Sequence, residues 1–299
     1  MITGSENNSA LISKKYSRHS QFSATWKRFR KNIGAMIGLV VIIIIILTAL
    51  TAPIFLDYET DVIGIDISRR LRLPSLEHPF GTDDLGRDIF SRVIYGARFS
   101  LAVGFVAVFI GLIVGVIFGA LAGYFVGRAE DIIMRVNDVL SSIPTILLGI
   151  VIVSALGANT FNLMLAVGIS SVPQFVRITR AAVLTVSSQE YVESCYAIGM
   201  SQSKIIALHV LPNCLSPIIV QTTLRIAGAI IAASSLSFLG LGVPAPAPEW
   251  GAMLSIGRQF VRTYPHITLF PGLAIMVTVL AFNMLGDGLR DALDPKLKK

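Results

Sequence analysis

The chain has 299 residues, of which 54% are hydrophobic and only 14% are charged, and its formal net charge is +7. A soluble globular domain carries about 25% charged residues, so this composition argues against a soluble protein. The apolar residues occur in long runs, and the basic residues lie mainly near the chain ends, beside such runs. The composition therefore predicts an all-α protein in a lipid bilayer, and the positive charge does not indicate nucleic-acid binding.

Residues 1–32 are predicted to form a polar N-terminal tail that is irregular up to about residue 25. The end of the tail is basic, with Lys27, Arg28, Arg30 and Lys31. Because Lys and Arg are enriched on the cytoplasmic side, we expect the tail to lie inside the cell. The apolar run at 33–56 is too long for a signal peptide and has no small-residue cleavage site after it, so it is predicted to be an uncleaved first span.

Residues 57–98 mix acidic and basic side chains and are predicted to form an extracytoplasmic loop. Thr82 is a candidate helix N-cap, which would place Asp83 and Asp84 in the first turn, where the helix dipole favours acids. A possible apolar stripe follows at Ile89, Val93 and Ile94. We therefore expect an amphipathic helix on the outer membrane surface that leads into the second span.

Residues 99–286 are predicted to form a core of five spans. The second span, at about 100–125, carries a glycine at every fourth position from Gly111 to Gly127. Such glycines share one helix face and let another helix approach closely, although a pore-lining stripe is the alternative. The third span, at about 132–156, contains Asp138 and also Pro144, which predicts a kink.

The fourth span is predicted to be short, at about 161–175, and Arg177 and Arg180 after it indicate a return to the cytoplasm. The fifth and sixth spans are expected at about 216–241 and 269–285, joined by an external loop whose alternating prolines exclude a helix near 242–251. A polar C-terminal tail at 287–299 ends in Lys296, Lys298 and Lys299. Both chain ends are basic, so an even number of spans is required, and six spans place the loop at 178–213 in the cytoplasm.

The polar segment from Glu190 to Asn213 is the main exception to the apolar character of the core. Glu190 and Glu193 begin a predicted helix, and Gly199 suits its C-terminus, where the chain enters the left-handed region. Ser201 could cap a second short helix, and Pro212 suits the start of the next element. The segment therefore predicts helix, tight turn and helix between two spans.

This spacing resembles the cytoplasmic loop of ABC importer permeases. In that pattern Glu-Ala-Ala is followed after three residues by Gly, and after a further eleven by Leu-Pro. The chain has Glu193-Ser194-Cys195, then Gly199, then Leu211-Pro212, with His209 where the family has Ile. The stretch from His78 to Leu101 and the C-terminal GDGLRDALDPKLKK are similar to the C-type subunit of dipeptide, oligopeptide and nickel importers.

The resemblance implies a type I ABC importer permease fold with six transmembrane helices and a coupling helix. It implies a location in a bacterial or archaeal inner membrane, both termini inside, with four kinds of partner: a homologous permease, two ATP-binding subunits, an extracytoplasmic substrate-binding protein and the lipid bilayer. ATP and Mg would bind to the ATPases, and no cofactor, catalytic site or metal site is expected in this chain. The residues expected to couple to the ATPases are Glu190, Glu193, Ser194, Cys195, Gly199, Ser201, Lys204, Leu211 and Pro212.

Arg225, Asp138 and Asn283 are candidates for the translocation path. A charge within a span is costly unless it is paired or hydrated, so Arg225 should face the bundle or a water-filled path. Arg225 could attract the C-terminal carboxylate of a peptide or could pair with the partner subunit. Small peptides are the expected cargo, with nickel as the alternative.

Two other classes of function make different predictions. The sequence contains no GxxxxGK[ST], HExxH, GxSxG or CxxC pattern, so no nucleotide-binding, hydrolase or zinc motif of these kinds is present. An ATP-independent carrier or channel would show ion-driven transport, and a membrane enzyme or assembly factor would show no solute flux. The two cysteines, Cys195 and Cys214, are expected to be reduced thiols.

Overall fold

The computed structural model describes residues 18–293, whose regular elements are all helices. The α-helices are α2 (Arg18–Lys31), α3 (Ile33–Phe55), α4 (Ile89–Tyr124), α5 (Arg128–Ser142), α6 (Thr145–Leu156), α7 (Thr160–Ser187), α8 (Glu190–Ala197), α9 (Gln202–Ile205), α10 (Leu215–Phe238), α11 (Trp250–Gly257) and α12 (His266–Leu293). Short 3₁₀ or π turns lie at Tyr58–Val62, Ile67–Arg69, Ile206–Val210, Leu211–Cys214 and Arg258–Phe260.

Within residues 18–293, five helical segments are long and apolar enough to cross a membrane: Ile33–Phe55, Ile89–Tyr124, Thr160–Ser187, Gln202–Phe238, which runs from α9 through α10, and His266–Leu293. The pair α5 and α6 adds a sixth span if it is counted as one element, although the two helices are bent by 91° at their junction. The prediction of an all-α protein is thus confirmed, and the six predicted spans are reached when this bent pair is counted as one.

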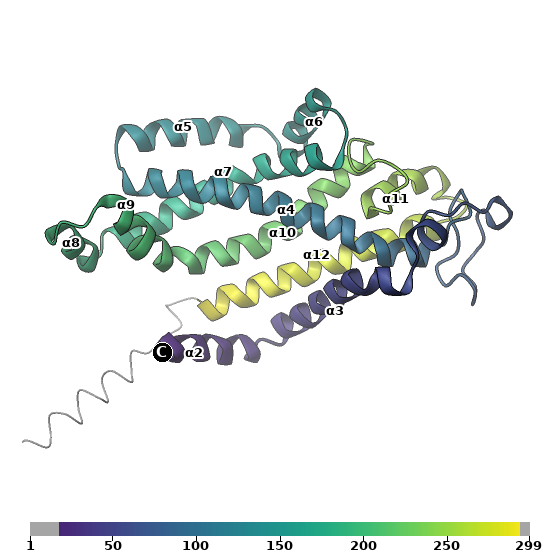
Figure 1. The fold of residues 1–299 in the computed structure, drawn as a ribbon, viewed down its shortest axis with the longest axis horizontal. Helices are drawn as coiled ribbons and strands as arrows, with labels where there is room; N and C mark the ends of the chain where they lie inside the picture. Colours follow the sequence, from purple (N-terminus) through teal and green to yellow (C-terminus); the bar gives the residue numbers. More distant parts are fainter. Residues whose placement is uncertain (1–17, 294–299) are drawn as a thin grey trace, which may run out of the picture.

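The long helices run lengthwise and pack side by side, with α4 against α7 and α12 against both α3 and α10 (Figure 1). The helices α8 and α9 form one tip of the molecule, and α2 and the end of α12 lie toward the same end (Figure 1). The segment 57–88 and α11 lie at the opposite end (Figure 1). One end is therefore formed by short helices and helix ends and the other mainly by a long loop segment with α11, and the long helices connect the two ends (Figure 1).

The glycine series on α4 packs against α7, as the spacing predicts. A Cβ atom at Gly115 would lie 2.3 Å from the Cβ of Phe175, and one at Gly119 would lie 2.7 Å from that of Thr179. Gly111 and Gly123 meet α7 in the same way. Gly127 does not belong to this contact, because it follows α4 and has open space around it.

The start of the second span differs from the prediction. The helix α4 begins at Ile89 and continues without a break to Tyr124, so no separate surface helix precedes it. Its N-cap is Asp88, whose side chain accepts a hydrogen bond from the Ser91 N–H at 2.7 Å. Thr82, which we expected to be the cap, instead receives the Arg72 N–H at 2.9 Å within the preceding turns.

The fourth span also differs, because α7 extends from Thr160 to Ser187 and is not short. Its two arginines lie within the helix, and each has an acidic partner on α5. Arg177 contacts Asp138 at 2.9 Å, and the Nε of Arg180 donates to Glu130 at 2.8 Å. The loop that follows begins only after residue 187.

The chain ends are more helical than expected. The helix α2 covers residues 18–31, which we predicted to be mostly irregular, and α12 continues to Leu293 through the expected C-terminal tail. The external loop at 242–266 contains α11, although its proline-rich start is non-helical as predicted. Residues 1–17 of the predicted tail and the lysines at 296, 298 and 299 lie outside the described residues.

Candidate functional site

The helices α8 and α9 with the turn between them form the candidate site, at one tip of the molecule (Figure 1). Gly199 has φ +78°, the left-handed conformation that its position after the first helix requires. Its N–H donates to the Tyr196 carbonyl at 2.9 Å, and the Met200 N–H donates to the Cys195 carbonyl at 3.1 Å. This pair of hydrogen bonds is a Schellman motif, which ends α8 and reverses the chain.

The second helix is held mainly by its backbone. Ser201 occupies the N-cap position of α9, but its side chain makes no capping hydrogen bond, contrary to the prediction. Its carbonyl accepts the Ile205 N–H at 3.0 Å. Pro212 stands at the start of the turn Leu211–Cys214, which leads directly into α10, so its missing N–H costs no helix hydrogen bond.

A small apolar cluster joins the site to the spans. Val192 and Ile205 are fully buried, and they pack with Val183 of α7 and Ile218 of α10. Cys195 and Cys214 belong to the same cluster, and both are free thiols. Cys195 thus lies beneath the surface of the unit rather than on it.

The other predicted coupling residues lie on or near the outer surface of this unit. Those exposed to solvent are Glu190, Glu193, Ser194, Gly199, Ser201, Lys204 and Pro212, and Leu211 is half-buried. The side chains of Glu190, Glu193 and Lys204 have no ion-pair partner among the described residues. The structure thus brings the predicted set together and leaves its charges available to another molecule.

Two residues of this surface were missed by sequence reasoning. Ile198, directly before the turn, has 76% of its surface exposed, which is high for a large apolar side chain. Tyr196 hydrogen-bonds through its hydroxyl to that of Tyr124, which ties α8 to the end of α4. For Ile198 the sequence did contain a signal, because this isoleucine stands directly between a predicted helix and the glycine that ends it.

The three path candidates are not all in one place. Arg225 on α10 donates to Gln174 at 2.9 Å and to Ser171 at 3.0 Å, both on α7. Asp138 pairs with Arg177, which is one turn along α7 from Gln174. Asn283 is exposed on α12, and its side chain makes no hydrogen bond within residues 18–293.

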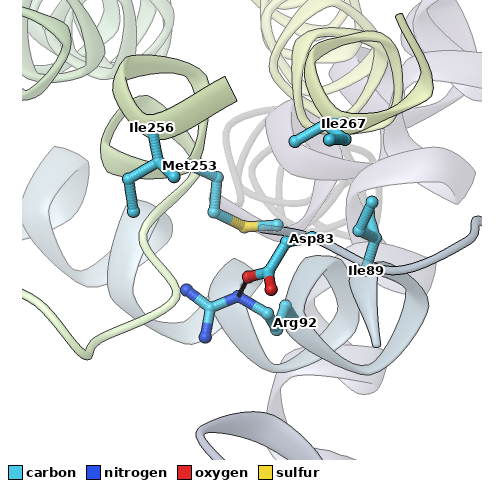
Figure 2. A pocket seen from close by; sticks show the side chains of 6 residues that line it. All are labelled: Asp83, Ile89, Arg92, Met253, Ile256 and Ile267. Carbon is cyan, nitrogen blue, oxygen red and sulfur yellow. Dashed lines mark ion pairs between the residues drawn. The ribbon is translucent and has the colours of Figure 1, made fainter. Parts of the chain in front are cut away.

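The opposite end holds a buried ionic network. Arg87 donates from Nε to the Asp83 carboxylate at 2.7 Å, and both side chains are almost fully buried. Figure 2 shows Arg92 directed at the same carboxylate, with Nε 3.7 Å from it, while Met253 and Ile267 cover the pair. The Nη1 of Arg92 donates to the Val62 carbonyl at 2.8 Å. In the part of the chain that the structure describes, no three His, Cys, Asp or Glu side chains are grouped to hold a metal.

Comparison with known proteins identifies the family. The model of the binding-protein-dependent transport system inner membrane component matches residues 115–299, and that of the N-terminal TM domain of oligopeptide transport permease C matches residues 20–74. The dipeptide transport system permease protein DppC of Alkalihalophilus pseudofirmus is 47% identical over 98% of this chain and 96% of its own. The glutathione transport system permease protein GsiD of Escherichia coli is 48% identical over 91% of this chain and 90% of its own.

Solved structures support the same fold. A chain of the methionine ABC transporter MetNI in an inward-facing conformation gives a TM-score of 0.57 at 17% identity, covering 69% of this chain and 98% of that one. A chain of an amino acid ABC transporter gives 0.53 at 16% identity, covering 67% and 94%. The predicted resemblance is confirmed: this chain belongs to the binding-protein-dependent transport system inner membrane component family, as an ABC importer permease of the peptide-transport type.

Proposed function

We propose that this chain is the C-type permease subunit of an ATP-driven importer of small peptides, and that it forms the translocation path with a homologous permease. Two ATPase subunits would bind ATP and Mg, and an extracytoplasmic binding protein would deliver the cargo. The observation that carries the proposal is the exposed α8–α9 unit, whose charged side chains have no partner within residues 18–293.

The α8–α9 unit is built to transmit force. Its outer face is exposed, while Val192 and Ile205 on its inner face pack against α7 and α10. Close-packed interiors do not compress, so displacement of the unit by an ATPase would move both spans. In this mechanism Glu193 anchors the unit on the ATPase, Gly199 sets the turn, and Pro212 fixes the exit toward α10.

The orientation of the chain follows from the distribution of charge. The basic end of α2 and the end of α12 lie toward the same end of the molecule as α8 and α9 (Figure 1). Because basic residues beside spans favour the cytoplasm, we assign this end to the cytoplasmic side. The segment 57–88 and α11 would then face the binding protein outside the membrane.

Small peptides are the proposed cargo because the relatives reported above are named for dipeptide and glutathione transport. The nickel alternative lacks comparable support, because neither of these relatives is named for nickel transport. The choice among dipeptides, longer peptides and glutathione-like peptides would rest with the binding protein.

Gly199→Val tests the coupling role. A Cβ atom at Gly199 meets nothing within 4 Å, so the substitution strains only the backbone, whose φ is +78°. Strain of about 1–2 kcal/mol is expected for a residue held in the left-handed region. ATP-driven peptide uptake should therefore fall about 5- to 30-fold, and ATPase subunits should co-purify less well, while the chain still inserts in the membrane.

Gly240→Val is the matched control. Gly240 has φ +82°, open space at its Cβ position and the same two hydrogen bonds, from its own N–H to Ser237 and from Leu241 to Leu236. It lies at the opposite end of α10 from the α8–α9 unit. ATPase co-purification should therefore survive this change. Equal loss in both variants, or uptake by the wild type that continues without ATP, would contradict the proposal.

A further inference from the structure

Arg225 lies near the middle of α10, inside the spanning region, and neutral groups hold its guanidinium in place. Nη1 donates to the Gln174 side-chain oxygen at 2.9 Å, and Nη2 donates to the Ser171 hydroxyl at 3.0 Å. The Nε atom is buried and has no hydrogen-bond partner among the described residues. Two acceptors on α7 thus fix the position of the charge without neutralising it.

This arrangement contrasts with that of the two arginines on α7. Arg177 pairs with Asp138, and Arg180 with Glu130, whereas no carboxylate within residues 18–293 lies in ion-pair range of Arg225. A cation in a membrane span costs several kcal/mol unless it is paired or hydrated. Arg225 therefore needs an anion or water from outside the chain described here.

The surroundings of Arg225 are too polar to face lipid. Gln174 and Arg177 are exposed on α7, one turn apart, and Gln221 on α10 donates to Gln174 at 3.2 Å. Polar groups in contact with hydrocarbon are costly, so this face must meet water or another protein. In a permease pair, such a face on α7 and α10 would line the path between the subunits.

The geometry suits a carboxylate. A guanidinium has five N–H donors, and only two of those on Arg225 are used, one on each terminal nitrogen. A donor thus remains on each terminal nitrogen, and paired donors of this kind bind carboxylates in a bidentate manner. The positive charge would repel a bare divalent cation.

We propose that Arg225 recognises a carboxylate group of the cargo as it passes between the two permease subunits. This proposal rests on the proposed function, and it narrows the cargo to molecules that carry an anionic group, such as the C-terminus of a peptide. Ser171 and Gln174 act as positioning residues, because they hold the guanidinium without competing for it as an acidic side chain would.

The test uses the whole transporter with its binding protein in proteoliposomes. Uptake of dialanine is compared with uptake of dialanine amide, which lacks the carboxylate, each supplied at a concentration that saturates the binding protein. For each peptide the rate of a variant is divided by the wild-type rate, so the preference of the binding protein cancels. Stimulated ATP hydrolysis is measured in parallel.

Arg225→Gln should lower dialanine uptake about 10- to 100-fold, as expected for loss of hydrogen bonds to a charged group, and should change amide uptake less than about twofold. Arg225→Lys should give an intermediate loss, because lysine keeps the charge but not the fork. Arg98→Gln removes a charge from an exposed position on α4 and is the matched control, with no expected change.

The outcomes separate this proposal from the proposed function. A parallel loss for both peptides would show that Arg225 serves packing or the partner permease, and would overturn the carboxylate proposal. Unchanged dialanine uptake in Arg225→Gln would overturn it as well. Wild-type uptake that resists vanadate or ATP depletion would instead refute the ATP-driven importer, whatever the variants do.

Discussion

The two ends of the molecule handle polar side chains in opposite ways. At the end formed by residues 57–88 and α11, Arg87 and Glu249 are almost fully buried, and both are hydrogen-bonded within the chain. At the α8–α9 end, Glu193 and Lys204 are exposed and have no ion-pair partner among the described residues. These charged side chains at the first end are hydrogen-bonded within the chain, whereas those at the α8–α9 end are exposed to solvent.

This difference predicts different consequences of mutation at the two ends. A buried charge that loses its partner is left in a medium of low dielectric constant, so damage at the first end should appear as lost stability. An exposed charge is already hydrated, so its loss at the α8–α9 end should leave stability unchanged and affect association with a partner. The largest effect is therefore expected at the buried end.

Arg87→Met should be the most damaging change at the buried end. It leaves the Asp83 carboxylate, 5% exposed, without its 2.7 Å partner. Removal of one member of a buried pair costs about 3–5 kcal/mol, and Arg92, 3.7 Å away, would compensate only in part. The melting temperature in mild detergent should fall sharply.

Arg69→Met is the control for Arg87→Met. Arg69 pairs with Asp66 at 3.0 Å in the same loop, but both side chains are 44% exposed. The melting temperature of this variant should match that of the wild type, because water replaces the lost partner. If the two variants melted at the same temperature, burial would not be what distinguishes the two ends.

Gly96→Ala should have the next largest effect. A Cβ atom at Gly96 would lie 2.1 Å from the Pro248 carbonyl oxygen, so the segment before α11 would have to move away from α4. Overpacking of this kind costs about 1–3 kcal/mol. Because Trp250 donates to Val93 of α4 at 2.9 Å, that displacement should also change the tryptophan fluorescence.

Gly272→Ala provides the comparison, since a Cβ atom on this α12 glycine would be 3.9 Å from its nearest neighbour, Leu254. Alanine is favoured over glycine within helices, so stability should stay constant or rise slightly. A loss of stability at Gly272 as large as that at Gly96 would contradict the close approach of α4 and the α11 segment.

Local chemistry predicted much of the candidate site. Gly199 in the sequence predicted a left-handed turn after α8. The four-residue spacing of the glycines on α4 predicted the contact between α4 and α7. Both features depend on residues close in sequence or on one helix face. The expected Ser201 cap failed because the backbone alone closes this short helix.

Long-range partners explain what could not be predicted. The ion pairs of Arg177 and Arg180 could not be predicted, because their acidic partners, Asp138 and Glu130, lie 39 and 50 residues away on α5. Thr82 has the chemistry of a cap, but the fold commits its hydroxyl to the backbone near Arg72. The acceptors of Arg225 could not be predicted either, because they lie 51 and 54 residues away on α7.

Glu249→Gln should give the smallest effect, and its dependence on pH is the informative part. Glu249 is 1% exposed and caps α11 by accepting the N–H groups of Gly251 and Ala252 at 2.9 and 2.8 Å. Burial raises its pKa above the ordinary 4.5, and this outweighs the opposing effect of the N–H donors. The folded state therefore favours the protonated carboxyl, and ionisation lowers stability as pH rises above 4.5.

The variant should be about 1 kcal/mol less stable than the wild type at pH 4.5, because the amide nitrogen cannot accept the second N–H. Only the wild type can ionise at this position, so the difference in stability between wild type and variant should narrow as pH rises from 4.5. Melting temperatures of the two proteins, measured side by side, would show this. Asp66→Asn should behave in the opposite way. The hydrogen bond from the Ser68 hydroxyl lowers the pKa of Asp66 below 3.8, so ionisation stabilises the folded wild type, and the stability difference between wild type and Asp66→Asn should widen as pH rises. A gap at Glu249 that also widened would mean that the N–H donors outweigh burial, and that this end holds its carboxylate ionised.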